Sequence, residues 1–101
     1  MGRVVHVPLS VLPPDVVSEL LRVLSEDVMA VATCKVADLL KKVGRDVPKP
    51  SLVYLAFRDD PAVKETLSRA VRDGVDIVDA INRLCSSRPD LCILVLEYGD
   101  E

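Results

Sequence analysis

The side chains that most often carry chemistry are few in this sequence. His6 is the only histidine, and it stands between Val5 and Val7 in a β-branched run. A catalytic imidazole needs a nucleophile and an orienting partner, and a multi-histidine metal site needs further imidazoles. We therefore predict that His6 is a structural or surface residue.

The three cysteines do not have the spacing of a known site. None belongs to a C-x-x-C pair, which excludes the usual zinc-knuckle and thioredoxin-type patterns. Cys85 and Cys92 flank the turn SSRPDL, where they form either a short local disulfide or two buried free thiols. Cys34 has Lys35 beside it but no neighbouring base, so we do not expect it to be a nucleophile.

Carboxylates and glycines argue against catalysis as well. Asp76 and Asp79 are three residues apart on an expected helix and could face one hard cation. No EF-hand spacing accompanies them, and nearby arginines favour a solvated face of ion pairs. The four glycines form neither a G-x-G-x-x-G nor a Walker-type loop, and no G-x-S-x-G elbow is present. We therefore predict a chain that is not an enzyme and uses neither cofactor nor metal.

A basic stretch is the feature that points most directly to a ligand. Asp38 and Asp46 dilute it, and Asp38 is at helical spacing from three of the lysines, so ion pairs to Asp38 would offset part of the charge. Basic side chains on a helix end and the following loop can hold phosphates, which predicts a surface for DNA or RNA. A solubilising charged face is the alternative. The residues concerned are Lys35, Lys41, Lys42, Arg45 and Lys49.

Hydrophobic spacing predicts the elements that position these side chains. Three apolar or β-branched runs are typical of strands, at 3–8, 51–57 and 91–98. Four stretches indicate helices, at 14–25, 35–43, 61–73 and 75–86. Pro8 indicates a strand end or a sheet edge, and Gly44 and Gly74 are natural helix stops.

Residues 27–43 fit two interpretations. They form either one long helix or a strand at 28–33 followed by the helix at 35–43. The order of elements predicts an α/β fold, a small layered sandwich with three or four strands. Helical crossovers favour partly parallel pairing in such a sheet.

Composition limits the class of protein. The 101 residues are half hydrophobic, which suits one domain over residues 1–101 with an ordinary core. The net charge of −3 argues against coating nucleic acid by bulk charge alone. No apolar run is long enough to span a bilayer, and the N-terminal residues lack a signal-peptide pattern, so we expect a cytoplasmic protein that binds no membrane.

Residue choice also bears on temperature. Glutamine is absent, Asn82 is the only asparagine, and charged pairs such as Asp60–Lys64 and Glu65–Arg69 recur at helical spacing. Few thermolabile amides together with ion pairs are typical of hyperthermophiles, whose intracellular proteins also use disulfides. We therefore expect a hyperthermophilic source.

Residues 33–71 contain, in order, the segments TCKVADLLKKVG, PKPSLVYLAFRDD and PAVKETLSRAV. This order resembles repressor-like helix-turn-helix DNA-binding domains. The resemblance implies a second helix that begins near Ser51 and presents Ser51, Tyr54, Leu55 and Arg58 to DNA. It also implies a set of core residues, Val36, Ala37, Leu40, Val53 and Phe57. The turn from Gly44 to Ser51 is longer than in that family, and an apolar SLVYLAF suits a buried strand better.

Two functions follow from these observations. The first is a small binding module without catalysis, a nucleic-acid-associated accessory or regulatory protein that uses the basic stretch at 35–49. The alternative is a protein–protein interaction or assembly module, including a homodimer, that uses sheet edges or apolar surface.

Overall fold

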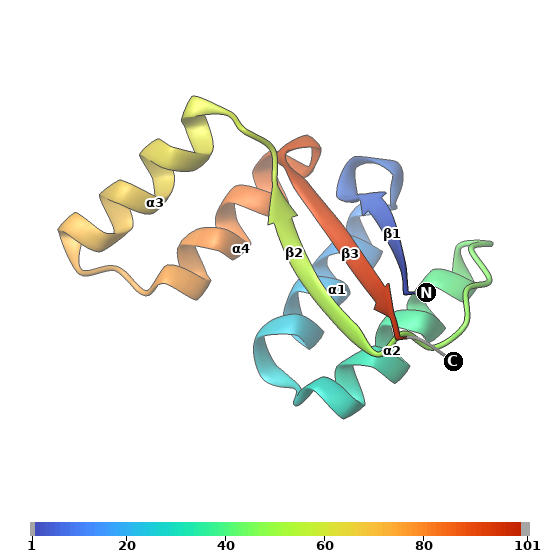
Figure 1. Cartoon of the computed structure of the whole chain (residues 1–101). Coiled ribbons are helices and arrows are strands. Elements are labelled where there is room, and N and C mark those ends of the chain that lie inside the picture. The colour runs from blue at the N-terminus through green and yellow to red at the C-terminus, as the bar shows by residue number, and fades with distance from the viewer. Residues whose placement is uncertain (1, 100–101) are drawn as a thin grey trace.

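Three strands and four α-helices make up residues 2–99, the part of the chain that the computed structural model describes (Figure 1). The strands are β1 (Arg3–Pro8), β2 (Leu52–Phe57) and β3 (Cys92–Tyr98). The α-helices are α1 (Pro14–Glu26), α2 (Met29–Lys42), α3 (Pro61–Asp73) and α4 (Ile77–Ser87). Two 3-10 turns, η1 (Leu9–Val11) and η2 (Pro89–Leu91), precede α1 and β3. The predicted α/β class and the three predicted strands are confirmed.

The last strand of the sequence lies in the centre of the sheet. The strand order is β1-β3-β2, and β3 pairs antiparallel with both neighbours. The expectation of partly parallel pairing is therefore wrong for adjacent strands. β1 and β2 do run in the same direction, as a helical crossover requires, but β3 is inserted between them, as in a split βαβ unit. Pro8 lies on an edge strand, as its lack of an N–H predicts.

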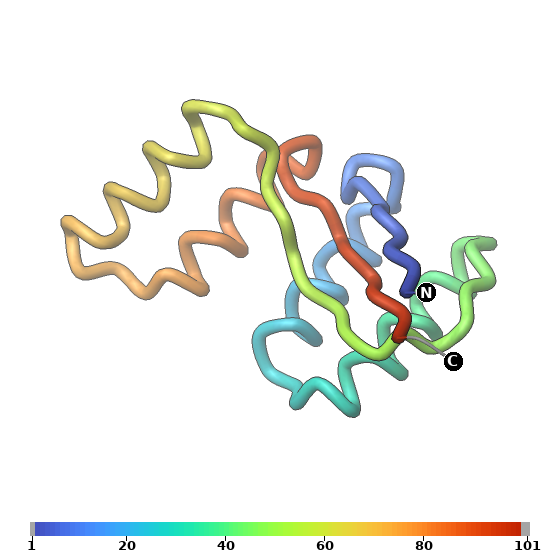
Figure 2. Tube along the Cα trace, viewed as in Figure 1, coloured from blue at the N-terminus to red at the C-terminus, as the bar shows by residue number. Residues whose placement is uncertain are grey.

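One face of the sheet carries the core. Val7, Val53, Leu94 and Leu96 alternate along the strands on this face and are buried. α1 and α2 cover it, and Figures 1 and 2 show both helices behind the strands. The remaining buried members of this core come from η1, the helices and the start of β3: Leu9, Leu12, Val16, Val17, Leu20, Leu21, Val23, Ala32, Val36, Leu40, Cys85 and Cys92.

The alternative strand at 28–33 does not form, and the helix expected at 35–43 begins earlier, at Met29. A continuous helix places Ala32, Val36 and Leu40 on one buried face at intervals of four residues. Thr33 is buried on the same side, and its hydroxyl donates to the Ala30 carbonyl, so this buried hydroxyl has a hydrogen-bond partner. Val28, with extended backbone angles, is the N-cap. Burial decides between two conformations that local propensity allows.

Helices α3 and α4 form a hairpin that projects from the end of the sheet (Figures 1 and 2). Val63 and Ala70 are the buried residues of α3, and a small second cluster of Val63, Leu84 and Leu91 joins the hairpin to its base. No helix within residues 2–99 is both long enough and apolar enough to cross a bilayer.

The predicted ion pairs on this hairpin are confirmed in part. Glu65 and Arg69 pair at 2.7 Å. Lys64 pairs with Asp59 at 3.6 Å instead of Asp60, because the Asp60 carboxylate accepts the Ala62 N–H and caps α3.

A disulfide joins α4 to the first residue of β3. Cys85 and Cys92 are both fully buried, their Cα atoms lie 5.6 Å apart, and the bond closes a loop across η2. The sequence allowed either a disulfide or two free thiols at these positions, and the structure contains the disulfide. Cys34 is exposed on α2 as a free thiol.

Removal of the disulfide should lower stability measurably. The two cysteines are seven residues apart. Closing a loop of this length lowers the conformational entropy of the unfolded chain, which stabilises the fold by about 2.5 kcal/mol. We expect the double substitution Cys85→Ala and Cys92→Ala to lower the free energy of unfolding by about that amount in urea titrations. Cys34→Ala is the matched control and should leave the midpoint unchanged. An unchanged midpoint in the double variant would contradict this expectation.

The η2 turn is held by a paired arginine and aspartate. Arg88 donates to both carboxylate oxygens of Asp90, at 3.0 and 2.9 Å, and this hydrogen bonding lowers the pKa of Asp90 below its ordinary value. The Arg58 guanidinium donates to the Asp90 carbonyl, so the same turn also contacts the end of β2.

Acid should therefore weaken this turn in a defined direction. Because the pKa of Asp90 is lower in the folded chain than in the unfolded chain, its ionised carboxylate stabilises the fold at pH values above the ordinary pKa of an aspartate, about 4. That contribution is lost as the pH falls through the folded pKa. In Arg88→Ala we expect the Asp90 carboxyl to titrate at higher pH than in the wild type, measured by NMR. Arg83→Ala, within α4, is the control and should leave the Asp90 titration unchanged. Equal Asp90 titrations in wild type and Arg88→Ala would refute the pairing.

Candidate nucleic-acid interface

The last turn of α2 and the loop after it position most of the predicted basic residues. The helix ends at Lys42, and Gly44 follows its C-cap Val43 with a positive φ of 83°, which allows the Arg45 N–H to bond the Leu40 carbonyl and the Gly44 N–H to bond that of Lys41. Lys41 and Lys42 lie in this final turn, where the partial negative charge of the helix end favours cations. The glycine stop predicted from sequence is confirmed.

The loop that follows is anchored to the core. Val43 and Val47 pack partly buried against the main cluster, and Pro50 is buried. Tyr98, near the end of β3, donates its hydroxyl to the Pro48 carbonyl at 2.7 Å. These contacts hold the exposed Arg45 and Lys49 in a defined loop beside the helix end.

The five predicted residues are not equivalent. Lys35 lies near the start of α2 and pairs with Asp27 at 2.9 Å. Lys35 pairs with Asp27 instead of Asp38, and neither Lys41 nor Lys42 pairs with Asp38, so the expected ion pairs of Asp38 do not form. The structure therefore sets Lys35 apart from a group of four, Lys41, Lys42, Arg45 and Lys49, which we call the basic corner. None of these four has an ion-pair partner among residues 2–99.

Sequence reasoning missed a basic residue from the other end of the chain. Arg3 begins β1 opposite Tyr98, and its guanidinium lies over the Tyr98 ring at 4.7 Å from the centroid. Since the Tyr98 hydroxyl contacts Pro48, Arg3 is placed next to the loop that carries Arg45 and Lys49. Nothing in the local sequence indicates this, because sheet pairing alone brings residues 3 and 98 together.

The charge of the chain is unevenly distributed around this region. Residues 35–49 contain five basic and two acidic side chains, whereas the rest of the sequence contains eight basic and fourteen acidic ones. A local positive field on an acidic body attracts polyanions to one place and repels them elsewhere.

The other candidate residues lie apart from one another. His6 is exposed on the sheet face opposite the helices, in register with Val95 and, beyond it, Tyr54. Tyr54 donates its hydroxyl to Glu97 on the same face, and this hydrogen bond raises the pKa of Tyr54. Asp76 is the N-cap of α4, where its carboxylate accepts the Val78 and Asp79 N–H groups. In the described part of the chain, no group of three potential metal ligands converges.

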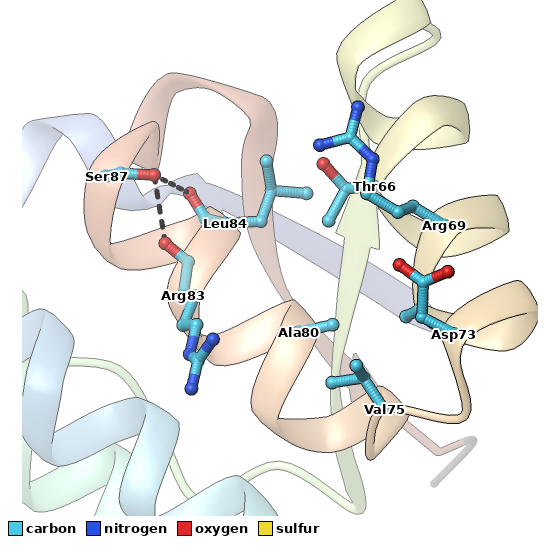
Figure 3. A pocket seen from close by; sticks show the side chains of 9 residues that line it. Thr66, Arg69, Asp73, Val75, Ala80, Arg83, Leu84 and Ser87 are labelled. Carbon is cyan, nitrogen blue, oxygen red and sulfur yellow. Dashed lines mark hydrogen bonds between the residues drawn. The ribbon is translucent and has the colours of Figure 1, made fainter.

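A pocket of about 300 Å³ lies between α3 and α4 (Figure 3). Arg69 and Asp73 line it from α3, and Arg83 and Ser87 line it from α4. The two guanidinium groups point away from each other, and the Ser87 hydroxyl is occupied by the Arg83 and Leu84 carbonyls. The pocket therefore presents no convergent polar set to a small ligand.

The residues that the helix-turn-helix resemblance would present to DNA lie on β2 and at its ends. Leu52–Phe57 is a strand, as the apolar run predicts, so contacts from Tyr54 or Leu55 would come from a strand. Of the implied core positions, Val36, Leu40 and Val53 are buried, and Ala37 and Phe57 are half-buried.

Comparison with known proteins adds no further assignment. Neither a family model, nor a curated protein, nor a solved structure matches the chain.

Proposed function

We propose that the chain is a small nucleic-acid-binding accessory protein that contacts phosphates through the basic corner and Arg3. The observation that carries this proposal is the group of four basic side chains on one helix end and its loop, without ion-pair partners among residues 2–99, in a chain of net negative charge. Cations that are not neutralised by neighbouring carboxylates retain their full attraction for phosphate.

The geometry favours backbone contacts over base reading. Lysines predominate in the basic corner, and lysine acts on phosphate as a flexible point charge. Sequence readout needs arginine, asparagine or glutamine held against base edges, and Arg45 sits in a loop. We therefore expect binding that depends strongly on salt and weakly on sequence.

Fluorescence anisotropy with labelled duplex DNA and labelled single-stranded RNA tests the proposal. With about four phosphate contacts, affinity should fall about a hundredfold between about 50 and 200 mM salt. The double substitution Lys41→Glu and Lys42→Glu should abolish measurable binding.

The matched control is Lys64→Glu with Arg72→Glu, which makes the same change in net charge on α3. It should reduce affinity much less, because α3 projects from the sheet on the side of the molecule opposite the loop that follows α2 (Figure 1). Equal losses in both double variants would mean that net charge alone governs binding. Flat titrations on both nucleic acids would overturn the proposal.

A hyperthermophilic source is a separate proposal. Its support is the composition together with ion pairs on three elements, Glu19–Arg22, Glu65–Arg69 and Arg88–Asp90, and a buried disulfide. We expect a thermal unfolding midpoint above about 90 °C by calorimetry. A midpoint in the ordinary mesophilic range would contradict it.

A further inference from the structure

β2 is an edge strand whose outward backbone groups are available for pairing. The Arg58 N–H bonds the Leu91 carbonyl at 2.9 Å, which continues the ladder between β2 and β3. Because hydrogen-bonding residues alternate along an antiparallel strand, the backbone groups of Val53, Leu55 and Phe57 point away from β3. A row of outward N–H and C=O groups is a template for another strand.

Two observations indicate that β2 is the edge suited to pairing. The Val53 N–H donates outward to the Met29 sulfur at 3.5 Å, and a thioether is a weak acceptor that a carbonyl readily replaces. The opposite edge of the sheet is less suited to pairing, because Pro8 occupies an outward position on β1 and has no N–H. Strand addition is therefore favoured on β2.

A groove of about 390 Å³ runs beside this edge. Leu55 and Phe57 of β2 form one side, and Val78 and Ile81 of α4 form the other. The end of α1 closes the groove with Leu24, and α2 contributes Met29. An extended segment lying there would bond β2 through its backbone and bury alternate side chains against these apolar walls.

The position of α4 excludes a partner whose own helices pack beneath the strand that it adds to β2. α4 lies beyond β2 on the side away from β3, in the layer that would cover a fourth strand (Figures 1 and 2). A second copy adding its β2 would bring its own α1 and α4 into the same space. The groove suits an isolated extended segment.

Acidic side chains beside the groove indicate which charge the bound segment carries at one end. Asp27 is the charged side chain lining the groove, and Lys35 pairs with it. Asp76 and Asp79 flank Val78 at the start of α4, are exposed, and have no ion-pair partner among residues 2–99. A basic residue in the bound segment complements this end.

We propose that this groove binds an extended segment of a partner protein as a fourth strand along β2. The segment carries apolar side chains at alternate positions and a basic residue at the end beside α4. This activity is independent of nucleic-acid binding, because the groove and the basic corner share no residue.

Selection from a displayed library of random twelve-residue peptides tests the proposal. Peptides with alternating apolar residues and a lysine or arginine should be enriched on the wild-type chain. A labelled enriched peptide should bind Val78→Arg at least tenfold more weakly in anisotropy titrations. Val71→Arg, an equally drastic change at an exposed valine of α3 outside the groove, is the matched control and should bind like wild type. The double substitution Lys41→Glu and Lys42→Glu should also retain peptide binding.

Amide hydrogen exchange by NMR identifies the binding mode. Added peptide should slow exchange at Leu55 and Phe57, whose N–H groups point outward, and leave Tyr54 and Ala56, which bond β3, unchanged. The proposal would be overturned if the wild-type chain enriched no peptides relative to Val78→Arg. It would also be overturned if a peptide bound without slowing amide exchange at Leu55 and Phe57. Protection that appears without peptide as protein concentration rises would show a second copy in the groove and overturn it as well.

Discussion

The pairing of β3 with both β1 and β2 is the constraint on which the rest of the structure depends. Neither outer strand has another partner within residues 2–99, and Leu94 and Leu96 of β3 are fully buried at the centre of the main cluster. The disulfide from Cys85 fixes the first residue of this strand to α4. Because β3 is last in sequence, the sheet joins the two ends of the chain, and contacts between residues so far apart in sequence are typical of slower folding.

A single helical layer on a three-stranded sheet leaves distinctive surfaces. The face opposite α1 and α2 carries exposed Val4, Leu52 and Tyr54, and β2 has an open edge beside a groove. The α3–α4 hairpin extends the molecule to 43 Å along its longest axis, against 27 and 24 Å along the others. Apolar surface of this kind is typical of proteins that bind other molecules.

Packing contacts, and not ion pairs with neighbouring carboxylates, position the side chains of the basic corner. Lys35 is drawn to Asp27 across the α1–α2 junction, whereas Lys41, Lys42, Arg45 and Lys49 follow a helix end and a loop anchored by Val47 and Pro50. Arg3 joins them through Tyr98. Fourteen of the sixteen acidic residues lie outside residues 35–49, so one corner of an acidic chain is left basic.

Local signals in the sequence determined the elements, and tertiary contacts decided how they combine. Helices at 14–25 and 61–73 and all three strands follow from apolar spacing, prolines and glycine stops, since these act within a few residues. Residues 28–33 suit both strand and helix, and burial of Ala32, Val36 and Leu40 decides for the helix. The sequence alone places Lys41, Lys42, Arg45 and Lys49 near one another and leaves the Cys85–Cys92 bond as one of two alternatives, but it does not place Arg3 beside the basic corner or β2 at an edge. Those two features depend on the position of β3 between β1 and β2, which is a pairing between residues far apart in sequence and leaves no local pattern.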